Sequence, residues 1–406
     1  MTLTIKQIYN RYSVRSFKRI IEVKRRKTDG SYEENWQNIE TLSAIKLGDD
    51  SVSNISYSLP NNSYNFGIVN VGNLQMSLIS KNGQFDDEEN PNSIFNGFLR
   101  HKSLIRVRDG YIDKYSSLNP VAILTTVFEG FIDETSTGTK VDKYNVIQDL
   151  QCTDLLSFLL KEYTIADIGS LSSTDLNSLI YEILNRELFT SFFNVSPDNI
   201  NAGYNITDFD ISKYEAQTTL FSLFESFSLG HSFFYVKNGN FYYQSVITGN
   251  QTDLEIAKNK IIEFAAYDNG ISSVFEKLYW EEDITVGFTS PIIKYNKSKT
   301  INIEGVTNPV QRQNLLNFIG GITKRQYKIV NLKIPYYMDI FILDKISVQI
   351  PEIIPKNAFI WGVSKWGQAK WQLPIRADNI STSTNWLVRQ ITHANFTTTL
   401  KLQELI

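Results

Sequence analysis

The stretch "SFFYVKNGNFYYQSV", residues 232–246, predicts two β-strands joined by a tight turn. The central Asn-Gly pair tolerates the positive φ angles that a two-residue hairpin requires. In that register Phe234 lies opposite Tyr243, and Tyr235 lies opposite Tyr242. Because side chains alternate between the faces of a strand, both faces of this ribbon carry aromatic rings. One face can be covered by the chain's own core, and the sequence leaves open what covers the other.

The composition limits the classes of function. The chain has 406 residues, 42% of them hydrophobic, which by length suggests roughly two to four domains. A net charge of -3 gives no sign of a polyanion binder. One cysteine and three histidines exclude an intramolecular disulfide and leave little material for a zinc site. The missing apolar leader and the lack of about 18 consecutive apolar residues predict a chain made and folded in a cytoplasm, without membrane insertion.

Residues 1–145 are predicted to form an N-terminal β-barrel or sandwich domain. Short apolar runs recur there at regular spacing, with Asn, Gly and Asp at the breaks. The predicted strands cover residues 17–26, 52–59, 73–80, 103–113 and 121–136. Residues 80–99 are polar and broken, and we expect a long surface loop there.

Three further regions follow from changes in the apolar period. Helices are predicted from Leu155, over 176–184 and over 220–227, so residues 146–250 form an inserted α+β domain that ends in the aromatic hairpin. Residues 251–350 are predicted to be a second β-barrel-like domain with one helix, which begins at Pro309 and ends at Gly320 and Gly321. Residues 351–406 are predicted to be a C-terminal β segment whose last 20 residues form a hairpin.

Several phrases occur in a recognisable order. An early strand with an Asp29-Gly30 turn is followed by "LQMSLISKNGQF", "SLIRVRDGY" and "VFEGFIDE", and later by a helix with the aromatic hairpin. The phrase "LKIPYYMDIFILDKISVQIPE" and a closing hairpin complete the series, with Leu343-Asp344 where a Gly is common. Together these phrases cover most of the chain and resemble the baseplate-hub or tail-tip hub family of tailed phages.

The resemblance implies a mainly β fold with an α+β insertion, in which two tail-tube-like β-barrels are joined by a mixed α/β domain. It implies a structural hub without enzymatic activity. A homotrimeric ring would cap the distal tail tube, match its sixfold symmetry and surround a passage that DNA crosses only transiently. The implied partners are the tail tube or distal tail protein and other tail-tip or fibre proteins, in a virion tail assembled in the host cytoplasm. The alternatives are a hexameric distal tail adaptor and a glycan-binding tail-tip protein.

Two candidate contact surfaces follow from the residues. A hairpin with rings on both faces exposes apolar area unless a neighbouring subunit or the chain's own helices cover it. The candidate subunit interface comprises Phe233, Phe234, Tyr235, Phe241, Tyr242 and Tyr243. A basic segment forms the second surface, which we expect to face protein or solvent rather than DNA. It contains Arg15, Lys18, Arg19, Lys24, Arg25, Arg26 and Lys27.

No catalytic, cofactor-binding or metal-ligating residue is predicted. Trp280 precedes three acidic residues, and a glycosidase needs two carboxylates about a sugar, but neighbouring residues of a strand point to opposite faces. The acidic run at 86–90 lacks the ligand spacing of a calcium loop. Glycine-rich phosphate loops are absent from the sequence.

Overall fold

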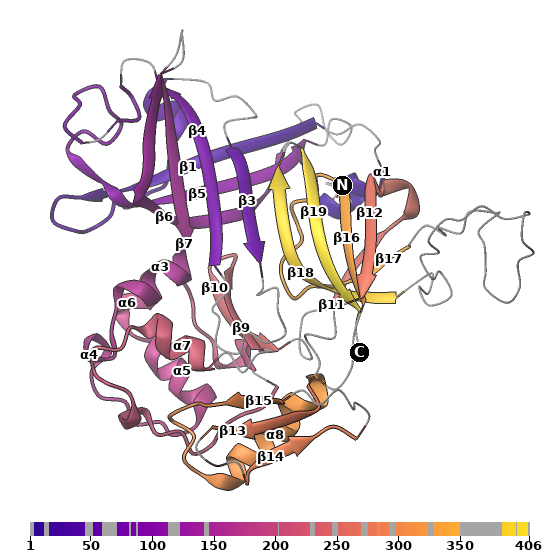
Figure 1. Cartoon of the computed structure of the whole chain (residues 1–406). Coiled ribbons are helices and arrows are strands. Elements are labelled where there is room, and N and C mark those ends of the chain that lie inside the picture. The colour runs from indigo at the N-terminus through magenta and orange to yellow at the C-terminus, as the bar shows by residue number, and fades with distance from the viewer. Residues whose placement is uncertain are drawn as a thin grey trace, which may run out of the picture.

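The computed structural model shows a mainly β chain, as predicted (Figure 1). None of its described helices is long and apolar enough to cross a membrane. The described residues are 4–11, 16–44, 52–58, 71–80, 83–86, 88–112, 122–141, 146–201, 203–227, 232–245, 251–268, 275–281, 283, 285–291, 298–323, 328–349, 384–394 and 396–404.

One large sheet contains 13 strands and joins the two ends of the chain. Its main path runs in space through β12 (Glu263–Asp268), β16 (Lys328–Pro335), β19 (Thr397–Glu404), β18 (Thr384–Ala394), β3 (Val52–Ser58), β4 (Val71–Ser80), β7 (Val146–Asp154), β6 (Ala122–Val141), β5 (Phe98–Ile112), β1 (Ser16–Lys27) and β2 (Gln37–Asn38). A branch from β18 adds β17 (Lys345–Val348), which pairs with β11 (Gln251–Ile256). No pairing among the described residues closes this sheet into a barrel, so the two-barrel arrangement stays a prediction.

The predicted helices of the insertion are confirmed, and each buries its apolar stripe. They follow β7 as α3 (Leu155–Glu162), α5 (Leu176–Leu184) and α7 (Leu220–Phe227). Two one-turn helices that were not predicted, α4 (Ile165–Ile168) and α6 (Glu187–Thr190), lie between them. Side-chain caps fix two of the starts: Asp154 accepts from the backbone N–H of Ser157, and Asp175 from that of Ser178. Short helices elsewhere are α1 (Ile5–Arg11), α2 (Ile39–Ser43) and the 3₁₀ turns η1 (Pro197–Asn199), η2 (Ile211–Lys213) and η3 (Lys258–Lys260).

The late helix α8 (Pro309–Thr323) packs on a separate three-stranded sheet. That sheet consists of β14 (Gly287–Thr289), β13 (Lys277–Trp280) and β15 (Ser298–Ile301). The prediction that α8 ends at the Gly pair is wrong, since the helix continues to Thr323. Gly320 serves close packing instead, because a Cβ there would lie 2.2 Å from the ring of Phe288.

The aromatic hairpin forms in the predicted register. Its strands are β9 (Ser232–Lys237) and β10 (Asn240–Ser245), with Phe234 opposite Tyr243 and Tyr235 opposite Tyr242. Asn238 and Gly239 have φ angles of 51° and 71°, as a turn of this type requires. The strand β8 (Ile200–Asn201) pairs with β10 and completes a small sheet.

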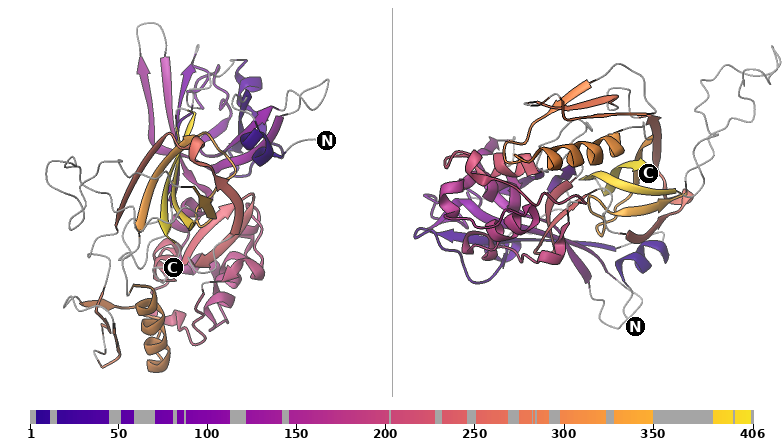
Figure 2. Two further views of the ribbon diagram at one scale, coloured as in Figure 1. Left: turned by 90° about the vertical axis from the view of Figure 1, so that its right-hand side faces the viewer. Right: turned by 90° about the horizontal axis from the view of Figure 1, so that it is seen from below.

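The hydrophobic interior comprises two clusters, and the hairpin lies between them. One cluster fills the large sheet, and the other fills the helices with the β13–β15 sheet. One hairpin face places Phe233 and Tyr235 in the first cluster, and the other face places Phe234, Phe241 and Tyr243 in the second. In Figure 1 and in the left view of Figure 2 the helices accordingly lie between the large sheet and α8.

The segment between β4 and β5 is a loop, as predicted, but it is not confined to the surface. Phe85 and Phe95 are fully buried and Ile94 is nearly so. The backbone N–H of Ile94 donates to the carbonyl of Gln84, and the carbonyl of Ile94 accepts from Arg25. The apolar side chains of this polar-looking segment therefore belong to the sheet core.

Two β regions near the end of the chain differ from each other. The phrase "FILDKISVQIP" forms a strand only in its second half, as β17, because residues 341–344 make a turn. The closing hairpin is confirmed as β18 and β19, which pair from Ala394 and Thr397 outward.

Gly110 in β5 gives the first testable prediction. A Cβ at Gly110 would lie 1.9 Å from the carbonyl oxygen of Ile123 on the paired strand. We expect Gly110→Ala to lower the free energy of unfolding by at least about 2 kcal/mol in urea titrations, as forced overpacking does. Gly321→Ala is the control, because no atom lies within 4 Å of its added Cβ, and it should be neutral or stabilise α8 by up to about 1 kcal/mol. Equal stability of the two variants would contradict the packing.

Candidate functional site

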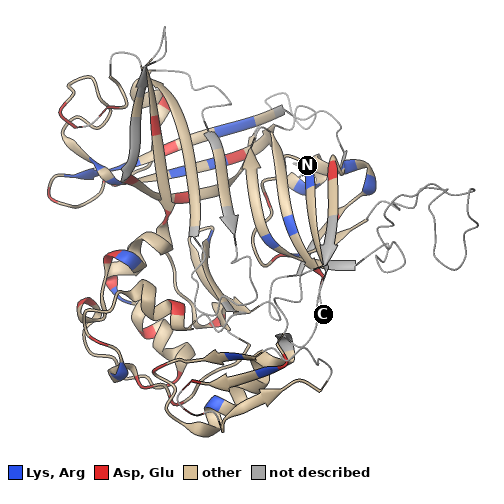
Figure 3. Ribbon diagram, in the orientation of Figure 1, with Lys and Arg blue, Asp and Glu red and all other residues tan. Residues whose placement is uncertain are grey.

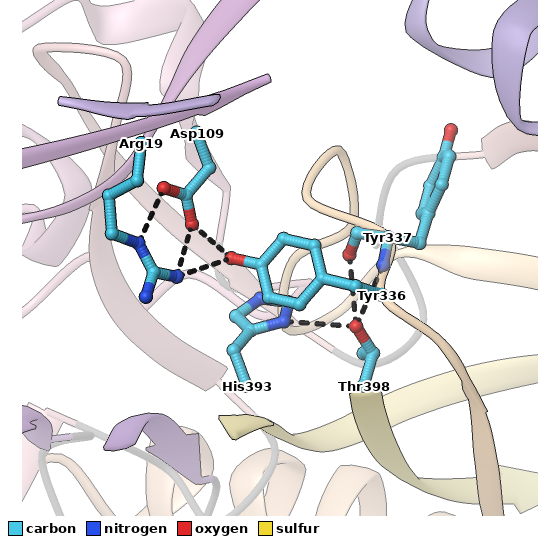
Figure 4. A network of polar contacts seen from close by, with 6 residues as sticks. All are labelled: Arg19, Asp109, Tyr336, Tyr337, His393 and Thr398. Atoms are coloured by element: carbon cyan, nitrogen blue, oxygen red, sulfur yellow. Dashed lines mark hydrogen bonds and ion pairs between the residues drawn. The ribbon is translucent and has the colours of Figure 1, made fainter. Parts of the chain in front are cut away.

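The two halves of the large sheet meet where β3 pairs with β18. Ile55 lies opposite His393, and Ser58 lies opposite Gln390. Beside this pairing lies a group of buried polar residues from both halves, which we call the polar joint (Figure 4). It consists of Arg19 and Asp109 from the N-terminal half and Tyr336, His393 and Thr398 from the C-terminal half.

Arg19 and Asp109 form the charged part of the polar joint. Their strands are paired in register, and the guanidinium meets the carboxylate through two bonds of 2.8 and 2.7 Å. The hydroxyl of Tyr336 donates to the same carboxylate, and Arg19 donates to that hydroxyl at 3.3 Å. Asp109 is fully buried, so these partners replace the water that an exposed carboxylate would bind.

His393 and Thr398 form the neutral part of the polar joint. Nδ1 of His393 lies 3.0 Å from the hydroxyl of Thr398, which also accepts from the backbone N–H of Tyr337 at 2.9 Å. The ring of His393 packs against that of Tyr336 with their centroids 5.0 Å apart. One segment, Tyr336 and Tyr337, thereby touches both parts.

Burial and the Arg19–Asp109 pair set the pKa values here. Burial lowers the pKa of Arg19, but the hydrogen bond and charge of Asp109 outweigh burial and raise it. Burial, followed by the charge of Asp109, raises the pKa of Tyr336. Burial, helped by the charge of Arg19, lowers the pKa of His393 to about 3. The joint thus holds one ion pair, a protonated tyrosine and a neutral histidine, an arrangement suited to fixing strands in place.

The residues considered for metal and sugar sites lie partly within the described part of the chain. In that part of the chain, no group of three or more His, Cys, Asp or Glu side chains could hold a metal ion. Trp280, considered as a sugar platform, is fully buried beneath Arg312. The other tryptophans considered for the glycan-binding alternative, Trp361, Trp366 and Trp371, lie outside the described residues.

The six hairpin residues are largely covered by the chain itself. Phe233, Phe234, Tyr235, Phe241 and Tyr243 are at most 3% exposed, and Tyr242 is half-buried. The two buried tyrosine hydroxyls are bonded, that of Tyr235 to Gln244 and that of Tyr243 to the carbonyl of Phe227. A subunit contact at this hairpin stays a prediction, and exposed aromatic area no longer argues for it.

The tip of the hairpin touches the C-terminal half of the chain. Lys237 lies 3.5 Å from the carboxylate of Asp344, which accepts from the backbone N–H of Phe341. Burial raises the pKa of Asp344, and the charge of Lys237 opposes that rise. Leu343 has a φ of 65°, a left-handed conformation that explains why Gly suits this position.

The basic segment is divided among several roles rather than forming one face. Arg15 lies outside the described residues, Lys18 and Lys27 are exposed, and Lys24 and Arg26 are half-buried. Arg19 belongs to the polar joint, and Arg25 pairs with Glu33 at 2.6 Å. Glu22, the segment's only acid, pairs with Arg106 and Arg108 of β5. Figure 3 shows basic and acidic residues side by side on these strands.

Sequence reasoning missed most of the polar joint. Arg19 was noticed only as one charge among seven, and its partner lies 90 residues away. Tyr336 and His393 had no local signal of a shared site. The one available hint was a charged residue on the apolar face of an amphipathic strand, since Arg19 shares that face with the buried Ile21 and Val23.

Removing one member of the ion pair tests the polar joint. We expect Arg19→Met to destabilise the chain by about 3 to 5 kcal/mol, because Asp109 stays buried without its cation. The double variant Arg19→Met/Asp109→Leu should recover much of that loss, whereas two independent sites would give additive losses in the same urea titrations. Additive losses would therefore contradict the pairing.

His393 predicts a pH dependence of stability. Its pKa is about 3 in the folded chain and about 6.5 when unfolded, so the unfolded state binds the proton first. Stability is full above pH 6.5 and falls as the pH drops toward 3, by up to about 1.4 kcal/mol per pH unit. Urea midpoints measured across this range should show a smaller pH slope for His393→Asn. An unchanged slope in that variant would assign the dependence to other groups.

Comparisons with known proteins agree with this fold. No protein-family model matches the chain, and no curated protein matches its sequence. Among solved structures, the 43 kDa tail protein of prophage MuSo2 from Shewanella oneidensis matches with a TM-score of 0.51 and 10% identity, over 95% of this chain and 98% of that one. A tail protein from Neisseria meningitidis MC58 matches with a TM-score of 0.51 and 10% identity, over 95% and 96%. The chain therefore has the fold of phage tail proteins, which confirms its resemblance to a baseplate-hub-like tail protein at the level of fold.

Proposed function

We propose that the chain is a structural hub of a phage tail tip or baseplate. Three copies form a ring that caps the distal tail tube, connects it to tip or fibre proteins and surrounds the passage for DNA. The observation that carries this proposal is the fold match to two tail proteins along nearly the whole of both chains. The chain acts by assembly in the virion tail, without turnover, after folding in the host cytoplasm.

The arrangement of the large sheet supports a pseudo-sixfold ring. Strands from 16–154 and from 251–404 make its two halves, and each half is proposed as one tail-tube-like barrel in the assembly. The proposed domains are 1–145, 146–250, 251–350 and 351–406. Three copies of two joined halves offer six similar units to a hexameric tube. The polar joint keeps the two units of one chain at a fixed angle.

Open sheet edges supply a route for ring closure. The path of the large sheet begins at β12 and ends at β1 and β2, and no described strand pairs with the outer edge of β12. β2 covers β1 at only two positions. An unpaired edge can bind a strand of another chain, and one acceptor edge with one donor edge per copy gives head-to-tail contacts that close into a ring. Ile262, next to β12 in the chain, is 52% exposed, and the proposed contact includes it.

The mass of the purified protein in solution tests this proposal. We expect a species of three times the 46.6 kDa chain mass that persists on dilution, measured by mass photometry and native mass spectrometry. A monomer at all concentrations would contradict the ring, and a stable hexamer would favour a six-copy adaptor.

A pair of matched variants tests the edge. Ile262→Glu should weaken association at least about tenfold, because it places a charge in the contact. Val310→Glu is the control, since Val310 is 67% exposed on α8, away from the large sheet. Equal association of both variants would exclude the β12 edge from the contact.

A further inference from the structure

The inserted helices carry a pocket that neither the polar joint nor the hairpin uses. Its volume is about 480 Å³, within the range of about 300 to 1,000 Å³ that small-molecule sites occupy. The outward face of α5 forms one wall, and the segment of η1 and β8 forms the other. The lining residues that matter most are Asn177, Tyr181, Glu182, Asn185, Arg186 and Pro197.

The helix α5 presents these side chains together because of its periodicity. Asn177 and Tyr181 are spaced by four residues, so they lie on one face of the helix, beside Glu182. Asn185 is the C-cap that follows α5, and Arg186 is the N-cap of the next helix, α6. The opposite face of α5 is buried in the helical core, and this packing fixes the position of the helix beside the pocket.

The charged pair in the pocket is held in place and balanced. Glu182 accepts from the backbone N–H groups of Ser172 and Ser173 at 3.1 and 3.0 Å, and Arg186 donates to the carbonyl of Ser170 at 3.0 Å. The two side chains lie 3.8 Å apart. One carboxylate beside one guanidinium leaves no net charge, so the pocket suits an uncharged ligand better than a phosphate or another polyanion.

The pocket also holds unused hydrogen-bonding capacity. Among the described residues, Oδ1 of Asn177 and Nε of Arg186 are buried without a hydrogen-bond partner. An unsatisfied buried group of this kind costs about 1 to 3 kcal/mol. A ligand rich in both donors and acceptors can lower that cost by drawing the amide and the guanidinium toward it.

We propose that this pocket binds a neutral saccharide unit. A sugar ring has an apolar C–H face, which can stack on the ring of Tyr181 or on Pro197. Its hydroxyls donate and accept, as the side-chain amides of Asn177 and Asn185 require. The proposal goes beyond the ring-forming role and does not rest on it, because the pocket lies wholly within one chain.

A sugar panel and two variants of one residue test this site. The full chain is titrated with glucose, galactose, mannose, N-acetylglucosamine and N-acetylgalactosamine, and saturation-transfer NMR follows binding. We expect saturable binding of at least one sugar, and Tyr181→Ala should weaken it by roughly tenfold, the effect of losing a stacked ring. Tyr181→Phe keeps the ring and should bind within about twofold of the natural chain.

Controls separate this site from general effects. Asn185→Ala should also weaken binding, whereas Asn314→Ala, an exposed asparagine on α8, should not. No saturable binding of any panel sugar, equal binding by Tyr181→Ala, or saturable binding of inorganic phosphate alone would overturn the proposal. The mass of each sample is measured in parallel, so a ring of normal mass without sugar binding overturns only this site, and sugar binding by a monomer overturns only the ring.

Discussion

The fold depends on a hairpin that needs a core on each of its faces. β9 and β10 carry rings on both sides, and the structure places one side in the sheet core and the other in the helical core. Neither core is complete without the hairpin, because its buried rings each remove a large apolar area from water. The insertion is therefore packed into the sheet rather than tethered to it, and the contact of Lys237 with Asp344 fixes the hairpin tip.

The polar joint helps to fix the position of the strands where the two halves of the large sheet meet. A one-residue slip already turns the apolar side chains of a strand to the wrong face, and a buried carboxylate adds a further penalty to any register that removes its partners. Asp109 is bonded to Arg19 and to Tyr336, 90 and 227 residues away in the chain. An apolar replacement could match the stability of such a pair, so we attribute to it a fixed angle between the halves rather than extra stability. Contacts of such sequence separation also predict slow folding.

Local sequence patterns predicted helices and strands, whereas the polar joint and the pocket depend on contacts between residues far apart in the chain. The register of β9 and β10 followed from Asn238-Gly239, and the buried stripes of α3, α5 and α7 followed from helical spacing. The polar joint could not be predicted, because nothing near Arg19 indicates a partner on β5. Gly320 was misread for a similar reason: a glycine that ends a helix and one that admits the ring of Phe288 look alike in sequence. The pocket on α5 was missed because its second wall comes from η1 and β8.

The aromatic side chains of the hairpin are buried within the chain, and this limits the surfaces that could form the proposed contact between subunits. Stacking one face of the hairpin against a neighbour would require opening the core that covers that face, so a subunit contact there stays a prediction that exposed apolar area does not support. Among the described residues, the surfaces that suit the proposed assembly include the open edge of β12 and the mixed charges on β1 and β5. Contacts of this kind are directional and sensitive to salt, so they suit a ring that must close at a set number of copies. The pocket proposed to bind a saccharide lies on α5, apart from the β12 edge, so ligand binding and ring closure can be tested independently.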